Sequence, residues 1–221
     1  FPAKDCLNSA VPCHKYLGEC FVLALGKLDD IAQEILRLKS LGHTVKIWGR
    51  DLKSCFRQVM ECPSSWQFQC FHGPDELLYF DLTALMGSVP SAMKAMRLGS
   101  LPLHAHIQEG HFMILYIDDF TGVDIEAEAA ASAASFDEKL RLLNLQQNIA
   151  KIEAPTASKK VLGIQVDCEN LILRFDKEKL QNIQSLLGLW PHGRPSSTLT
   201  ELRSLAGKLL NICKVVPQFR P

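Results

Sequence analysis

The chain has 221 residues, of which 47% are hydrophobic and 22% are charged. These are ordinary values for a globular protein, and they exclude a disordered tail, a collagen-like fibre and a simple coiled coil. The 24 basic and 24 acidic side chains balance. The chain therefore lacks the basic excess that is typical of a module that binds nucleic acid through phosphates alone.

The longest apolar runs fall far short of the roughly 20 residues that a membrane span needs, and no signal peptide is recognisable. None of the eight cysteines forms a CxxC pair or has zinc-finger spacing. We therefore expect reduced thiols in an intracellular protein, in the cytoplasm or nucleus. Because the chain opens at Phe1 without a methionine and ends at Pro221, we also expect it to be a fragment of a longer protein.

The first 22 residues show no clear period, whereas the next segments do. Apolar residues at helical spacing predict an amphipathic helix that begins near Lys27 and ends before Gly42: Leu28, Ile31, Ile35 and Leu38. Alternating residues then predict a strand, Val45 to Asp51, with an acidic tip.

Two further apolar stretches, 66–71 and 77–82, flank a Gly-Pro-Asp turn and predict a hairpin. Methionines and leucines in 88–107 indicate a helix that Gly99 and Pro102 interrupt. His104 and His106 have no companion ligands at a helpful spacing, so we interpret them as structural or surface residues.

The apolar run Phe112–Ile117 is typical of a buried central strand. It leads directly into Asp118-Asp119, and strand-like character resumes in 120–125, so the two acids are predicted to lie in a tight hairpin turn. A helix is predicted at 127–145, with an acidic start at Asp124 and Glu126. A hairpin of 161–166 with 171–175 and a helix at 180–187 follow. After a linker at 191–197, a capped helix begins at Thr198 and points its leucines inward.

Adjacent carboxylates directly behind an apolar run place like charges at the edge of a core, where repulsion and burial both cost free energy. A divalent cation removes both penalties, and Mg²⁺ prefers carboxylates together with substrate phosphates. Two such ions can activate an attacking oxygen and stabilise a leaving one in phosphoryl transfer. The plain alternative is that aspartate simply favours turns.

Three segments together favour a metal site over this plain alternative. Tyr116-Ile117-Asp118-Asp119 resembles the YxDD box of reverse transcriptases, and the segment from Asp51 to Val59 resembles their first acidic motif. Val161 to Asp167 is similar to their "LG" primer-grip hairpin, and the order along the chain agrees. In detail the chain most resembles the polymerase of DIRS-like retrotransposons, which carry a tyrosine recombinase. The similar segments there are 46–50 and the helix at 201–208.

The resemblance implies an α+β fold: a polymerase palm with an antiparallel sheet backed by helices. Residues 1–43 would be partial fingers, 44–175 the palm, and 176–221 a helical thumb or connection. It also implies an RNA-directed DNA polymerase, a nucleotidyltransferase that uses two Mg²⁺ ions, with Mn²⁺ as an alternative. Its partners would be an RNA or DNA template-primer and dNTP, within a longer polyprotein that includes RNase H.

The resemblance also assigns roles to residues. Asp51 and Asp118 would hold the ions, with Asp119 as a supporting acid and the Leu52 carbonyl as a further ligand. The substrate would be contacted by Phe56, a steric gate against the ribose 2′-hydroxyl, by Tyr116 and Ile117 at the primer end, and by Gly87 with the helix after it. Lys151 would be the general acid for pyrophosphate, with Lys159 and Lys160 as alternatives. Phe56 as an ordinary core residue and Lys151 as a solvated lysine are the plain interpretations.

The sequence also departs from the family. The usual Pro-Phe-Gly-like triplet is replaced by Leu85-Met86-Gly87, and the fingers segment before Asp51 is short. These departures favour a second hypothesis, an inactive or repurposed remnant that only binds nucleic acid or a protein partner. A third is a nucleotidyl cyclase, against which the absence of a Gly-Gly-Asp/Glu-Glu-Phe turn argues.

Overall fold

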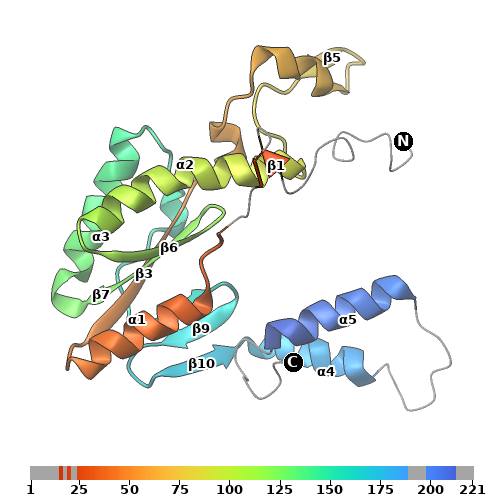
Figure 1. Ribbon diagram of the computed structural model, residues 1–221. Helices are drawn as coiled ribbons and strands as arrows, with labels where there is room; N and C mark the ends of the chain where they lie inside the picture. The colour runs from red at the N-terminus through yellow and green to blue at the C-terminus, as the bar shows by residue number, and fades with distance from the viewer. Residues whose placement is uncertain (1–14, 17–18, 21–23, 189–197, 213–221) are drawn as a thin grey trace.

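The computed structural model describes residues 15–16, 19–20, 24–188 and 198–212. It combines antiparallel sheets with helices, as the sequence predicts (Figure 1). In chain order its elements are β1 Lys15–Tyr16, β2 Glu19–Cys20, α1 Leu28–Ser40, β3 Val45–Asp51, β4 Cys70–His72, β5 Leu78–Phe80, α2 Val89–Gln108, β6 Phe112–Tyr116, β7 Asp119–Ile125, α3 Glu126–Leu142, β8 Ser158–Val161, β9 Ile164–Asp167, β10 Ile172–Phe175, α4 Lys177–Gly188 and α5 Leu199–Ile212. None of the described helices is both long and apolar enough to span a bilayer.

The central sheet has the strand order β3-β7-β6, all antiparallel, and it separates two hydrophobic cores. Alternation along β3 sends Val45 and Ile47 into the core with α1 and the β8–β10 sheet. The same alternation sends Trp48 into the core with α2 and α3 on the opposite face. Both faces of the sheet are therefore covered, which fixes the strand register by burial.

The strand β6 lies at the edge of this sheet, and β7 is the central strand, so the prediction that 112–117 forms the central strand is wrong. The apolar run reflects burial on both faces instead: Met113 and Leu115 enter one core and Ile114 the other. The open edge is partly covered by the chain before α1, where the Gly26 N–H donates to the Leu115 carbonyl at 2.8 Å.

The helix α2 continues through Gly99 and Pro102, contrary to the predicted interruption. Gly99 permits close packing on the sheet, because a Cβ atom there would lie 2.8 Å from Cδ2 of Leu115 and 3.2 Å from Cζ of Phe120. Pro102 is buried in the same helix and removes one backbone donor without ending it. Packing against the sheet therefore outweighs the local helix-breaking tendency.

The smaller predictions have mixed outcomes. The hairpin β4–β5 forms as predicted, but the stretch before it is a 3₁₀ helix, Pro63–Phe68. The acidic residue Asp124 lies in β7 and not at a helix start, because it pairs with buried groups of the sheet. The predicted linker at 191–197 lies outside the described residues.

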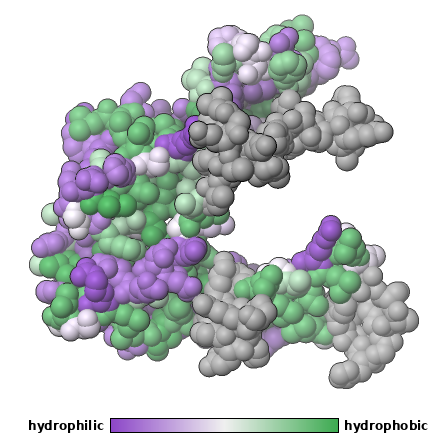
Figure 2. Space-filling view, in the orientation of Figure 1, coloured by the Kyte–Doolittle hydropathy of each residue, from purple (hydrophilic) through white to green (hydrophobic). Residues whose placement is uncertain are grey.

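The helix α5 opens with the predicted capping box, in which the Glu201 N–H donates to Oγ1 of Thr198 at 3.2 Å. The leucines predicted to point inward do not lie in a core: Leu202 and Leu209 are exposed, and Leu205 is partly exposed. Figure 2 shows hydrophobic side chains on the surface of the α4–α5 pair. The inward placement predicted for these leucines is therefore wrong for the described part of the chain.

Candidate active site

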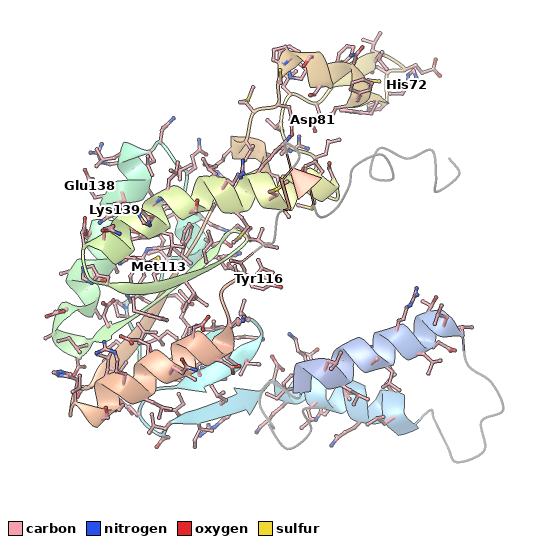
Figure 3. The ribbon with its side chains drawn as sticks, viewed as in Figure 1. His72, Asp81, Met113, Tyr116, Glu138 and Lys139 are labelled. Carbon is pink, nitrogen blue, oxygen red and sulfur yellow. The ribbon has the colours of Figure 1, made fainter. Side chains whose placement is uncertain are left out.

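Three side chains from three strands form a row across one edge of the central sheet. The register places Asp51 of β3 opposite Asp119 of β7, and Asp119 opposite Tyr116 of β6. Tyr116 lies at the end of β6 (Figure 3). Residues directly opposite each other in an antiparallel pair project to the same face. The fold thus brings together the two acidic segments that the sequence separates.

Ile117 and Asp118 form the two-residue turn between β6 and β7, and Asp119 is the first residue of β7. Only one of the two acids therefore lies in the predicted turn. Ile117 has a φ of 62°, which is strained for a β-branched residue, and its N–H donates to Sδ of Met96 at 3.0 Å. The Leu52 N–H donates to the Asp118 carbonyl at 3.2 Å and ties the end of β3 to the turn.

Both carboxylate oxygens of Asp51 have partners in a segment about a hundred residues later. The ammonium of Lys151 lies 2.8 Å from Oδ1, and Nδ2 of Asn148 donates to Oδ2 at 3.1 Å. The Asn148 N–H also donates to the Asp51 carbonyl at 2.8 Å, which anchors the segment to β3. The sequence interpretation missed Asn148, because the loop after α3 carries no periodic pattern.

The three acids shift one another's pKa values. Burial acts to raise the pKa of Asp51, but hydrogen bonds with Lys151, Asn148 and Asp119 outweigh it, so that pKa is lowered. Partial burial, the hydrogen bond with Asp51 and the charge of Asp118 raise the pKa of Asp119 to about 6. Burial and the charge of Asp51 also raise the pKa of Asp118. Asp51 and Asp119 thus form the hydrogen-bonded pair, with Asp118 as a charged neighbour.

The other predicted substrate-binding residues lie on nearby elements. Phe56 is half-buried in the 3₁₀ helix Cys55–Gln58 and packs against the core under α2 and α3. Gly87 has a φ of 90° and is exposed just before α2. Leu52 is buried.

Of the three candidate lysines, only Lys151 contacts an acid of the site, Asp51. Lys159 pairs with Glu153 at 2.5 Å, and Lys160 pairs with Asp176 at 2.6 Å. The hydrogen bond with Asp51 raises the pKa of Lys151. Lys151 therefore stays protonated beside the carboxylates at neutral pH.

Three carboxylates face one ammonium here, so the site carries excess negative charge and only oxygen donors. This donor chemistry fits a hard divalent cation such as Mg²⁺. The three groups do not all converge within 4.8 Å, since the one described set of three ligand-type side chains that does so is His106, Glu109 and His111.

No family model and no curated protein matches the sequence. Solved structures do match. A foamy virus protease-reverse transcriptase in complex with double-stranded DNA has a TM-score of 0.62 at 15% identity, covering 93% of this chain and 32% of that chain. The same protein with an RNA/DNA hybrid has a TM-score of 0.54 at 15% identity, covering 76% and 21%.

Telomerase from Candida albicans, in complex with a fragment of telomeric RNA, has a TM-score of 0.51 at 12% identity, covering 88% of this chain and 43% of that chain. The chain spans less than half of each of these three structures. At these identities the likeness concerns the fold. The chain therefore has the fold of a reverse-transcriptase polymerase domain.

Proposed function

We propose that this chain is a reverse-transcriptase polymerase domain, which joins dNTPs to a primer 3′-hydroxyl on a nucleic-acid template. The observation that carries the proposal is the pairing of Asp51 with Asp119, next to the Asp118 turn, on a reverse-transcriptase fold. The YxDD-like sequence and the LG hairpin between β8 and β9 support it. In this proposal the chain comes from a DIRS-like retrotransposon. Residues 1–43 form the fingers, residues 44–175 form the palm, and residues 176–221 form the thumb or a connection.

In the proposed mechanism Asp51, Asp118 and Asp119 would hold two Mg²⁺ ions, and the Leu52 carbonyl would be a further ligand. When bound, such ions lower the pKa of the attacking hydroxyl and neutralise charge on the triphosphate. Lys151, whose ammonium already lies at Asp51, gives its proton to the departing pyrophosphate oxygen. Its three N–H donors and flexible stem suit that movement.

The apolar residues of the site position the substrates. The half-buried ring of Phe56 is anchored in the core, so it can exclude a ribose 2′-hydroxyl without moving. Tyr116 and Ile117 lie at the turn of the hairpin, where the primer terminus would lie. The backbone of Ile117 is strained in this turn, as is common for residues at functional sites. Gly87 leaves room for a template nucleotide before α2.

The proposed partners are a template-primer duplex and dNTP, within a longer polyprotein that carries RNase H. Solved structures with this fold include complexes with double-stranded DNA and with an RNA/DNA hybrid, which supports a nucleic-acid partner. Balanced net charge requires local contacts and not a general basic field.

Primer extension in Mg²⁺, measured on this chain with any flanking sequence that its gene encodes, tests the proposal. Asp51→Asn and Asp118→Asn each remove a carboxylate of the site and are expected to lower the rate at least about 100-fold. Glu128→Gln makes the matched change on α3, beyond the opposite end of β7, and is expected to retain full activity. Extension that is unaffected by both aspartate variants contradicts the proposal.

A second candidate is a palm that binds nucleic acid without catalysis. It is favoured by the two protein partners that already occupy the Asp51 carboxylate, Lys151 and Asn148. The Leu85-Met86-Gly87 departure points the same way. Primer extension together with a binding measurement separates the two functions. A protein that only binds nucleic acid extends no primer. It still binds the template-primer in fluorescence anisotropy, and Asp51→Asn leaves that binding unchanged.

A further inference from the structure

Two histidines and a glutamate meet at the C-terminal end of α2, at the opposite end of β6 from Tyr116. His106 lies in the last turn of α2, Glu109 follows that helix directly, and His111 precedes β6. One possible ligand atom from each lies within 4.8 Å of the other two. The sequence interpretation saw only the His104/His106 spacing, whereas the true companions of His106 stand three and five residues after it.

His106 has one ring nitrogen with a hydrogen-bond partner among the described residues and one without. Its ring is fully buried, and Nε2 lies 3.2 Å from Oγ of Ser132. Nδ1 is buried and has no hydrogen-bond partner among the described residues. A buried polar atom without a partner costs free energy, and an ion or a water molecule that binds to it removes that cost.

His111 has the hydrogen bond to a carboxylate that is typical of a metal-binding histidine. Its Nδ1 lies 3.2 Å from Oδ1 of Asp124, and Oδ2 of that carboxylate accepts from Nε1 of Trp48 at 2.7 Å. A carboxylate on one ring nitrogen fixes the tautomer and leaves the other nitrogen as a stronger ligand. Nε2 of His111 is therefore the nitrogen that is available to a ligand.

Glu109 is held in a similar way by α3. Its Oε2 accepts from the ammonium of Lys139 at 2.6 Å and from Oγ of Ser135 at 3.1 Å. Lys139 extends from α3 toward the end of α2 (Figure 3). The second carboxylate oxygen, Oε1, remains for a ligand. The hydrogen-bond partners of the three residues come from α3 and β7.

We propose that His106, Glu109 and His111 bind a zinc ion, with water as the fourth ligand. Two histidines and a glutamate are an established zinc donor set, and imidazole nitrogen selects Zn²⁺ over Mg²⁺. Bonds of about 2.0–2.1 Å hold tetrahedral ligand atoms roughly 3.3 Å apart, so the three atoms close by no more than about 1.5 Å. The rings of His106 and His111 are stacked with their centroids 4.5 Å apart, so the two imidazoles lie side by side.

The ion would join the end of α2, the start of β6 and, through Ser132 and Lys139, the helix α3. It would therefore link the helices α2 and α3 to the central sheet. This site shares no residue with the Asp51 site, so the inference holds whether or not the chain is a polymerase.

Competition with a chromophoric zinc chelator, in excess Mg²⁺ to occupy oxygen-only sites, measures the affinity. Glu109→Gln changes an exposed side chain and leaves the fold intact, and it is expected to weaken Zn²⁺ binding more than 10-fold, as is His111→Gln. His104→Ala removes an exposed histidine on the same helix and is expected to have no effect. Equal affinity for the wild type and Glu109→Gln overturns the proposal.

Cobalt substitution supplies a second measurement, because the chain contains eight cysteines and thiolates are also zinc ligands. The proposed site predicts the visible spectrum of four-coordinate Co²⁺ without the intense near-ultraviolet band of a cobalt–thiolate bond. A thiolate band of full intensity at one equivalent of Co²⁺ would instead assign the metal to cysteine and contradict the proposal.

Discussion

Asp119 holds its proton more tightly than an ordinary aspartate, because partial burial, a hydrogen bond with Asp51 and the charge of Asp118 all disfavour its ionised form. Its pKa of about 6 lies above that of an aspartate in the unfolded chain, about 3.9. Between these two values the folded protein binds a proton that the unfolded chain has released. The contribution of Asp119 therefore lowers the free energy of unfolding as the pH rises from about 4 to about 6.

Asp119→Asn removes this titration while it keeps the shape of the side chain. In the absence of divalent cations the variant is expected to melt at a higher temperature than the wild type at about pH 7, with the difference vanishing near pH 4. Thermal melts of both proteins across this range, in chelator, measure the difference. A difference that stays constant with pH would show that Asp119 does not titrate in this window.

The sequence was sufficient to find the acids but not their partners. Asp118 and Asp119 follow an apolar run, and Asp51 ends an alternating one, so each carries a local signal. The hydrogen bonds of Asp51 with Asn148 and Lys151 span 97 and 100 residues, across a loop without a period. Contacts of that kind are set by how the loop returns to the sheet, which local pattern does not encode.

At the scale of the elements, Trp48 and Gly122 determine how β3 and β7 pack. They lie opposite each other in the register, and the indole ring covers the glycine. A Cβ atom at Gly122 would lie 2.5 Å from Cε2 and 2.6 Å from Cζ2 of the ring. The ring is fully buried and its Nε1 is held by Asp124, so it cannot move aside cheaply.

Gly122→Ala is expected to lower the free energy of unfolding by about 1–3 kcal/mol, the usual cost of overpacking a core. Urea denaturation followed by tryptophan fluorescence measures it. Gly207→Ala is the matched control, since a Cβ atom in that part of α5 meets nothing within 4 Å, and it is expected to cost no stability. Equal stability of Gly122→Ala and the wild type would contradict this account of the β3–β7 contact.

The elements that the sequence predicted well are those whose period is local. The helix α1 matches its four buried residues, β3 has the predicted bounds, and β7 covers the predicted strand at 120–125. The continuity of α2 through Gly99 and the edge position of β6 were not predictable, because both depend on packing between distant segments. Composition shows that a face is buried, but it does not show which element covers it.

At the scale of the whole molecule, the two cores on either side of the central sheet contrast with the helical pair at the C-terminal end. The α1 helix buries four side chains against the sheet. In α5, by contrast, Leu199 is 61% exposed and Leu210 is 56% exposed, and its main described neighbour is α4 (Figure 1). Helices of this length depend on tertiary packing for most of their stability in water.

Hydrogen exchange followed by mass spectrometry should resolve this difference along the chain. The amides of β7 lie in the centre of the sheet, so they are expected to exchange only through global unfolding. The amides of α5 are expected to exchange through local opening, with protection at least about 100-fold lower, because few buried contacts oppose that opening. The α1 helix is the control of similar length, and its protection is expected to approach that of β7. Equal protection in α5 and α1 would show that the α5 leucines are buried in solution, and it would contradict the exposed surface described above.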